Sequence, residues 1–292
     1  MKKFVKWSVC LILAICLFFD VQTSERVVAK AAKAQTSYEK QYKVSTNNTA
    51  YKKYMSKGSS TKLNIKKGNK KLNPRKVKFT SRNKKIATVD KNGVVHARKT
   101  GKTDINVRYK GQTCVIKLTV TKKFSRTVFI GDSRTVDMFE ARKSQIKGAV
   151  HNHIQVFAKD GGTVQYAQDV ITTLDWENYD TVVLWMGAND RGNFKPYEKL
   201  YNQLYGLGKR MILCTVGPVN EAVLTDEDLT FFSNGKIKNY NTNMKKWASA
   251  HGVGVVDLYP YIEENVNYSY DGIHYDPKPT TELWHHILNC IR

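Results

Sequence analysis

The chain has 292 residues, a length that predicts two domains at the usual size of roughly 100–200 residues each. Hydrophobic residues make up 41% of the sequence and aromatic residues 11%, so the chain can bury a core and is not wholly disordered. Its formal net charge of +23 would suit a protein that binds nucleic acid or an anionic surface, and the distribution of that charge distinguishes the two.

The positive charge is concentrated in one part of the chain. Residues 35–123 contain 25 basic and three acidic residues, whereas residues 124–292 contain 17 basic and 20 acidic residues. The first segment therefore carries a net charge of +22 and the second a net charge of −3, which predicts two units with different roles. We expect four segments: a signal peptide at 1–34, a linker at 35–52, a first domain at 53–122 and a second domain at 123–292.

The first residues are typical of a secretory signal peptide. Three lysines precede an apolar run that ends at Phe19, and a small-x-small cleavage pattern follows at residues 32–34, with a competing one at 27–29. We therefore expect the protein to be secreted or associated with the cell surface. Without cleavage, the same run would act as a short N-terminal membrane anchor.

The basic segment begins with a polar stretch and then changes to strand-like alternation. From residue 35 to about residue 57, Ser, Thr, Asn, Lys and Tyr predominate without aliphatic periodicity, which predicts a solvated linker. Apolar and polar residues alternate at 77–79, 105–109 and 114–120, and Asn-Gly and Lys-Gly pairs between such runs supply turns. This pattern predicts a small β-sandwich.

Three stretches of this segment carry a family resemblance. Residues 78–83 (Lys-Phe-Thr-Ser-Arg-Asn), 86–90 (Ile-Ala-Thr-Val-Asp) and 99–105 (Lys-Thr-Gly-Lys-Thr-Asp-Ile) resemble the group 2 bacterial immunoglobulin-like domain. The resemblance covers about residues 53–122. It implies a surface module of an exported bacterial protein, which acts as a spacer or binds polysaccharide.

The lysines of the basic segment fall at the outward positions of the alternating strands. They either form a solvated face that keeps the sandwich soluble or attract an anionic cell-wall polymer. We do not expect nucleic acid as a partner, because the basic stretch lacks interleaved exposed aromatic residues for base stacking.

The second segment alternates short apolar runs with helical spacing. The apolar runs are residues 127–130, 153–157, 181–186, 210–216 and 253–258, and the helical stretches include 197–207, 237–250 and 282–291. Five buried strands that alternate with helices predict a three-layer, flavodoxin-like α/β domain with a five-stranded parallel sheet. Ligands of such sheets bind at the carboxyl ends of the strands.

Polar motifs stand at the predicted strand ends and in the last loop. They are Gly-Asp-Ser-Arg at 131–134, Gly-Gly at 161–162, Gly-Ala-Asn-Asp at 187–190 and Asp-Gly-Ile-His at 271–274. These four motifs in this order resemble the SGNH (GDSL-type) hydrolase family, over residues 126–292. The Gly-x-Ser-x-Gly nucleophile motif of the α/β-hydrolases is absent, because Thr135 stands where its second glycine would be.

Hydrolysis of an ester through such motifs needs an activated nucleophile. A serine hydroxyl becomes nucleophilic when a neighbouring base accepts its proton, and Ser133 and His274 suit these two roles. Asp271 lies three positions before the histidine, so a single turn can direct its carboxylate at Nδ1. We therefore expect Ser133, Asp271 and His274 to be the catalytic residues, in the order along the chain that the resemblance implies.

The oxyanion that develops on the ester carbonyl needs fixed hydrogen-bond donors. The candidates are the backbone N–H of Ser133, the backbone N–H of a glycine in the second motif, and the side-chain amide of Asn189. Gly161 and Gly162 could each supply the glycine N–H, and we favour Gly161. We expect no metal and no cofactor, because the His and Cys residues lack the spacing typical of metal ligands.

Together these features predict an exported serine esterase that hydrolyses short-chain acyl esters of carbohydrate, acetyl esters foremost, through an acyl-serine intermediate. The absence of a long apolar lid between the motifs favours short acyl groups. The alternatives are a catalytically inactive surface protein that binds carbohydrate, and a lipolytic esterase or acyltransferase of the same family. The expected partners are an acylated carbohydrate or other small ester and, for the basic domain, an anionic cell-wall polymer.

Overall fold

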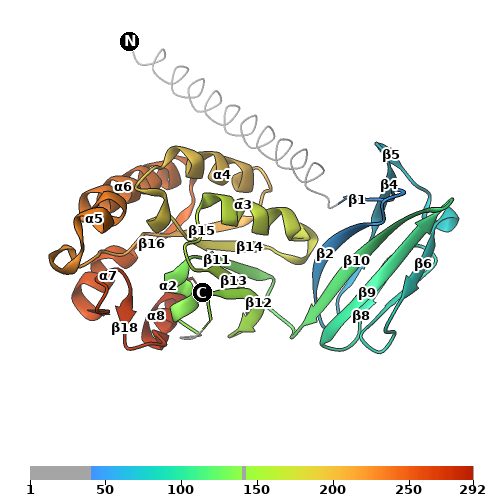
Figure 1. The fold of residues 1–292 in the computed structure, drawn as a ribbon, viewed down its shortest axis with the longest axis horizontal. Helices are drawn as coiled ribbons and strands as arrows, with labels where there is room; N and C mark the ends of the chain where they lie inside the picture. The colour runs from blue at the N-terminus through green and yellow to red at the C-terminus, as the bar shows by residue number, and fades with distance from the viewer. Residues whose placement is uncertain (1–40, 140–142, 292) are drawn as a thin grey trace, which may run out of the picture.

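The computed structural model describes residues 41–139 and 143–291, which form an all-β part followed by an α/β part (Figure 1). The predicted signal peptide and the beginning of the predicted linker lie outside the described residues. In the described part of the chain, no helix is both long enough and apolar enough to cross a membrane.

The all-β part consists of small sheets around one core. The strand orders are β1-β4-β5, β2-β10-β9-β6 and β3-β8-β7. Ile65, Val95 and Ile116 come from different sheets and are buried in the same core, which confirms the predicted all-β fold. The strands are β1 (Gln41–Lys43), β2 (Thr49–Ser56), β3 (Ser60–Lys62), β4 (Asn64–Lys67), β5 (Lys70–Lys71), β6 (Lys78–Ser81), β7 (Ala87–Val89), β8 (Val94–Ala97), β9 (Gly101–Tyr109) and β10 (Gln112–Thr121).

The linker predicted at 35–52 is wrong from residue 41 onward, because the sandwich already begins there. Strand β1 pairs in parallel with β4, and β2 pairs in parallel with β10 from Thr49. Tyr42 and Val44 are buried in the core, at 1% and 4% exposure. These two apolar residues stand among polar ones, so the composition of the stretch gave no sign of a strand.

The α/β part is built on a six-stranded sheet of order β12-β13-β11-β14-β15-β16. The five strands predicted from the sequence are present and parallel, as β13, β11, β14, β15 and β16. The prediction missed β12, an edge strand that runs antiparallel to β13 and carries a bulge at Gly148. The strands are β11 (Thr127–Gly131), β12 (Gln145–His151), β13 (Ile154–Lys159), β14 (Thr181–Trp185), β15 (Arg210–Cys214) and β16 (Gly254–Val256).

Helices cover both faces of the sheet, which confirms the predicted three layers (Figure 1). Successive residues of a strand point to opposite faces, so Val182 and Val183 of β14 lie in two different cores. Helices α3, α4 and α6 pack on the first core, and α2, α7 and α8 on the second. The helices are α2 (Ser133–Asp137), α3 (Val164–Thr173), α4 (Lys195–Tyr205), α5 (Asp226–Phe232), α6 (Asn234–His251), α7 (Leu258–Asn265) and α8 (Thr281–Ile291).

Buried contacts join the two parts of the chain. Lys53 of β2 is 1% exposed, and its ammonium forms an ion pair with Asp175 in the loop before β14. The Tyr54 ring meets the Phe157 ring of β13 edge-on, with ring centroids 5.2 Å apart. The sandwich therefore packs near the start of β14, and the carboxyl ends of the parallel strands lie at the other end of the sheet (Figure 1).

Candidate active site

Ser133 stands at the sharp turn between β11 and α2. It is the first residue of α2, and the Asp132 side chain caps the helix by accepting the N–H of Arg134 at 3.1 Å. Gly131 ends β11, and a Cβ at this position would overlap the Thr135 side chain. The glycine thus lets helix and strand approach closely, and the turn places Ser133 at the carboxyl end of a central strand.

A second turn brings the predicted base to this serine. The carboxylate oxygen Oδ1 of Asp271 accepts the backbone N–H groups of Ile273 and His274, both at 2.9 Å. Its other oxygen, Oδ2, lies 2.6 Å from Nδ1 of His274, and Nε2 of the same ring lies 2.9 Å from Oγ of Ser133. The three predicted catalytic residues therefore meet in one chain of hydrogen bonds.

The ionised state of Asp271 fixes the direction of these hydrogen bonds. Burial raises the pKa of its carboxyl, but the hydrogen bonds from the N–H and the ring of His274 and from the N–H of Ile273 bring the pKa below its usual value. A carboxylate can only accept hydrogen bonds, so Nδ1 of His274 carries the proton between them. Nε2 is then the acceptor for the Ser133 hydroxyl, the arrangement in which an imidazole acts as general base.

The surroundings of the glycine pair favour Gly161 over Gly162 as the second oxyanion donor. The N–H of Gly162 is already used, because it donates to the carbonyl oxygen of Lys159 at 2.9 Å. Gly161 lies in the left-handed region with φ of 61° and lines the pocket beside Ser133. Within the described residues, neither its N–H nor that of Ser133 donates to a protein acceptor.

Asn189 lines the same pocket as Ser133 and Gly161. Its Nδ2 donates to the carbonyl oxygen of Gly162 at 3.0 Å, which fixes the amide and leaves its second N–H for a ligand. The neighbouring Asp190 accepts the hydroxyl of Tyr197 at 2.6 Å and the N–H of Val164, so it holds the loop. All the predicted oxyanion donors therefore border the same pocket as the Ser133 hydroxyl.

The pocket that contains these groups has a volume of about 490 Å³ and a wall of mixed polar and apolar surface. It is lined by Ser133, Asp137, Lys143, Ser144, Asp160, Gly161, Asn189, Phe232, Asp271, Ile273, His274 and Lys278. Lys278 pairs with Asp137 at 3.1 Å across the wall. Burial and the nearby Asp137 raise the pKa of Asp160, which His274 and Lys278 oppose. Asp137, Asp160 and Lys278 were not predicted as wall residues, because no sequence motif contains them.

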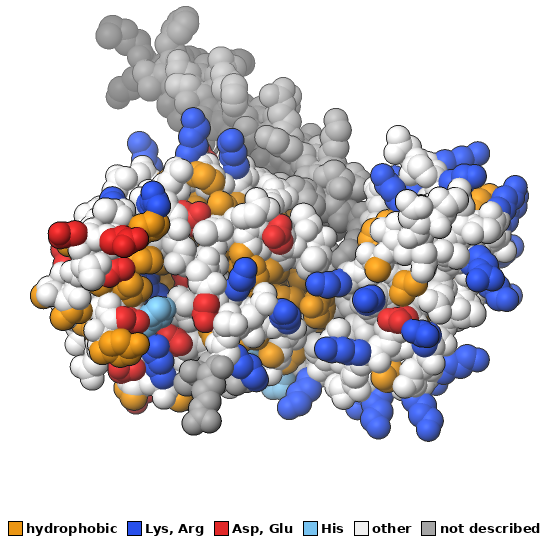
Figure 2. All heavy atoms as spheres, in the orientation of Figure 1, with side chains coloured by type: hydrophobic (Ala, Val, Ile, Leu, Met, Phe, Trp, Pro, Cys, Tyr) orange, Lys and Arg blue, Asp and Glu red, His pale blue; other side chains and the backbone are white. Residues whose placement is uncertain are grey.

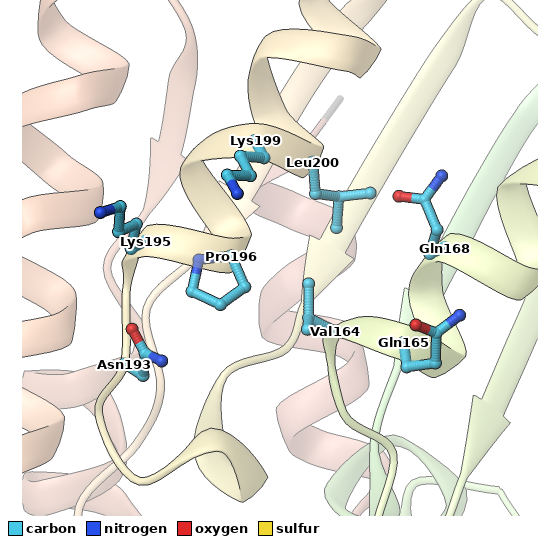
Figure 3. Close-up of a pocket in the computed structure, with 8 residues that line it drawn as sticks. All are labelled: Val164, Gln165, Gln168, Asn193, Lys195, Pro196, Lys199 and Leu200. Atoms are coloured by element: carbon cyan, nitrogen blue, oxygen red, sulfur yellow. The ribbon is translucent and has the colours of Figure 1, made fainter.

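A further pocket, of about 310 Å³, lies between α3 and α4 (Figure 3). Its wall contains Gln165, Gln168, Lys195 and Lys199 but no carboxylate, histidine or serine. Without a nucleophile and a base in contact, it does not compete with the pocket at Ser133 as an active site.

Comparisons with known proteins agree with both parts of the fold. Residues 129–278, just over half of the chain, match the GDSL-like lipase/acylhydrolase family, and residues 39–120 match the group 2 bacterial Ig-like domain. No curated protein sequence matches the chain.

Several solved structures resemble the chain. A lipase/acylhydrolase from Enterococcus faecalis is 19% identical, with a TM-score of 0.43, over 56% of this chain and 94% of that one. The acetyl xylan esterase AlAXEase is 18% identical, with a TM-score of 0.41, over 57% and 100%. The C-terminal catalytic domain of peptidoglycan O-acetyltransferase A from Streptococcus pneumoniae is 19% identical, with a TM-score of 0.41, over 56% and 91%. By the family match, the chain belongs to the GDSL-like lipase/acylhydrolase (SGNH) family, and it carries an N-terminal group 2 bacterial Ig-like domain.

Proposed function

We propose that this protein is an exported serine esterase that removes short acyl groups, acetyl foremost, from carbohydrate. The observation that supports an active enzyme is the unbroken contact from Asp271 through His274 to Ser133. A chain that had lost its activity and only bound carbohydrate would not need this alignment.

In the first half of the reaction, Oγ of Ser133 attacks the carbonyl carbon of the ester while Nε2 of His274 accepts the hydroxyl proton. Asp271 stabilises the imidazolium that forms. The oxyanion is stabilised by the N–H groups of Ser133 and Gly161 and by the amide of Asn189. When the carbonyl re-forms, the bond to the alcohol breaks, His274 returns the proton to the leaving oxygen, and an acyl-Ser133 remains.

In the second half, a water molecule takes the place of the alcohol. His274 accepts a proton from the water, and the resulting hydroxide attacks the acyl carbon. Collapse of the second tetrahedral intermediate returns the proton to Oγ of Ser133 and releases the carboxylic acid. A sugar hydroxyl in place of the water would make the same residues an acyltransferase.

The pocket wall supports carbohydrate as the alcohol part of the ester. Phe232 and Ile273 are the apolar side chains of a lining that otherwise consists of charged, hydroxyl and amide groups, the imidazole of His274 and one glycine. A long acyl chain needs a predominantly apolar wall, whereas sugar hydroxyls are recognised by polar groups of this kind. We expect a short acyl group to lie beside these two apolar side chains.

We also propose that the sandwich carries the enzyme to an anionic polymer of the cell wall. Lys and Arg side chains crowd its surface, with few acidic ones among them (Figure 2). A surface of one sign attracts a polyanion over a longer range than any single contact. This localisation depends on export, which the N-terminal sequence predicts.

Acetate release from acetylated cell-wall and plant polysaccharides tests the proposal, with long-chain p-nitrophenyl esters as the comparison. We expect release by the wild type and none by Ser133→Ala. Activity confined to long-chain esters would favour a lipolytic enzyme, and equal rates in both proteins would contradict an enzyme acting through Ser133. Transfer of acetyl to added oligosaccharide would identify an acyltransferase.

A further inference from the structure

Arg134, the residue directly after the nucleophile, is buried at 2% exposure and reaches across to the loop that carries the base. Its Nε and Nη2 both donate to the carbonyl oxygen of Ile273, each at 3.2 Å. The guanidinium carbon lies 5.3 Å from the centre of the Tyr275 ring. One side chain thus contacts the residues on both sides of His274.

This burial is costly for a side chain that stays charged. No ion pair joins Arg134 to a carboxylate in the part of the chain that the structure describes, and its Nη1 has no hydrogen-bond partner there. The two hydrogen bonds to the Ile273 carbonyl and the attraction of the buried Asp132 carboxylate compensate the guanidinium for the loss of water. An apolar side chain of similar length would fill this space at lower cost to stability, so the contact calls for a further explanation.

The peptide group between Ile273 and His274 is held at both of its polar atoms. Its carbonyl oxygen accepts the two donors of Arg134, and its N–H donates to Oδ1 of Asp271 at 2.9 Å. The orientation of this peptide group sets the backbone conformation at His274 and therefore the direction in which the imidazole ring points. The backbone of Arg134 is fixed as well, because its N–H donates to the Asp132 side chain.

We propose that Arg134 is a positioning residue for the reaction: by holding the Ile273 carbonyl, it fixes the His274 ring within reach of the Ser133 hydroxyl. The inference rests on the proposed esterase activity. A base must lie about 2.6–3.2 Å from the proton that it accepts. The observed 2.9 Å between Nε2 and Oγ joins two segments that lie 141 positions apart, and Arg134 links the same two segments through a second contact.

Two variants of the full-length protein separate positioning from packing. Arg134→Met keeps the apolar length and removes every donor, and Arg134→Gln places one amide nitrogen about where Nε stands. On p-nitrophenyl acetate we expect kcat to fall about 10²-fold for Arg134→Met, the typical cost of a misplacement of about 1 Å, with KM unchanged. Arg134→Gln is expected to fall between Arg134→Met and the wild type.

Tyr275→Phe is the matched control. It removes the hydrogen bond from the Tyr275 hydroxyl to the Pro218 carbonyl, at 2.9 Å, and keeps the ring under the guanidinium. We expect this variant to lose stability but to keep its kcat. If kcat falls equally in Tyr275→Phe and Arg134→Met at equal loss of stability, general loop stability explains the effect and the inference is overturned.

Arg134→Met, folded and with the kcat of the wild type, would also overturn the inference. A wild type no faster than Ser133→Ala would instead overturn the proposed function. In that case the Nδ1 proton resonance of His274 still tests the positioning. It should be sharp in the wild type and Tyr275→Phe and broadened or lost in Arg134→Met, and an unchanged signal would count against Arg134.

Discussion

The sandwich and the α/β domain use charge in different ways. The sandwich carries most of its lysines outward with few acidic residues among them (Figure 2), whereas the α/β domain carries both signs and has charged side chains in the wall of its pocket. Exposed charges act over about 10 Å at 0.1 M salt, but a hydrogen bond acts over one contact. Substitutions in the pocket should therefore have large effects on kcat that do not depend on salt. Substitutions on the sandwich surface should have small effects on binding to a polyanion, and high salt should abolish these effects.

The largest effect is expected from Asp271→Asn, which keeps the shape of the site and removes its negative charge. The amide would favour the wrong tautomer of His274 and could not stabilise the imidazolium, so kcat should fall about 10⁴-fold. The rate ratio to the wild type, measured on p-nitrophenyl acetate at low and high NaCl, should be the same. A ratio that salt changes strongly would contradict the contrast between the two domains.

The same variant has a pH signature. The folded protein lowers the pKa of Asp271 below its ordinary value of 3.8. A carboxyl of lowered pKa contributes stability above its unfolded pKa and loses it as the pH falls through the folded pKa. The difference in free energy of unfolding between wild type and Asp271→Asn, from urea titrations, should be greatest near neutral pH and shrink below about pH 4. A constant difference at every pH would show that the charge is not responsible.

Lys53→Met tests an exception to this comparison, because Lys53 belongs to the sandwich but is buried. The substitution leaves Asp175 without its partner at the interface, which should cost about 3–5 kcal/mol of unfolding free energy. The matched control is the double variant Lys53→Met with Asp175→Leu, which removes both charges and should recover most of the loss. Equal stabilities of the single and double variants would mean that the ion pair does not hold the parts together.

Asn189→Ala should have a somewhat smaller effect, confined to the reaction. Loss of one oxyanion donor typically lowers kcat by about 10²- to 10³-fold. The Asn189 side chain is also bonded to the Gly162 carbonyl, so a melting curve must accompany the kinetics. A wild-type kcat in a folded variant would remove Asn189 from the oxyanion hole.

The smallest effect is expected from Lys67, Lys70 and Lys71 of the sandwich, which are exposed around β4 and β5. Their replacement by Gln should leave kcat unchanged and lower the NaCl concentration that elutes the protein from isolated cell walls. Retention that neither salt nor the substitutions change would leave these lysines as a solvated face.

Much of the candidate site can be predicted from the sequence, because short motifs encode it. Asp271 and His274 stand three positions apart, and Gly131 and Ser133 frame one turn, so local geometry fixes their orientation. The contact between Ser133 and His274 follows from the position of both motifs at the pocket edge of the sheet. Gly161 was favoured over Gly162 from the sequence, but the physical reason, the bond from the Gly162 N–H to the carbonyl of Lys159, is visible only in the structure.

Other features could not be predicted because their partners are distant in the chain. Lys53 stands in a polar stretch that was expected to be solvated, and only its contact with Asp175, 122 positions later, explains its burial. The wall pair of Asp137 and Lys278 likewise forms only when α2 meets the last loop. Strand β12 was missed because its sequence at 145–151 mixes apolar, basic and glycine residues and lacks the continuous apolar run of its neighbours.

The ion pair of Lys53 with Asp175 and the ring contact of Tyr54 with Phe157 also limit where the protein can be truncated. A fragment that starts after Lys123 would not be a finished catalytic unit. In this fragment the carboxylate of Asp175 would lack its ion-pair partner, and the Phe157 ring would lose the Tyr54 ring that packs on it. Slow kinetics or aggregation of such a fragment would then reflect this exposed surface and not the chemistry at Ser133.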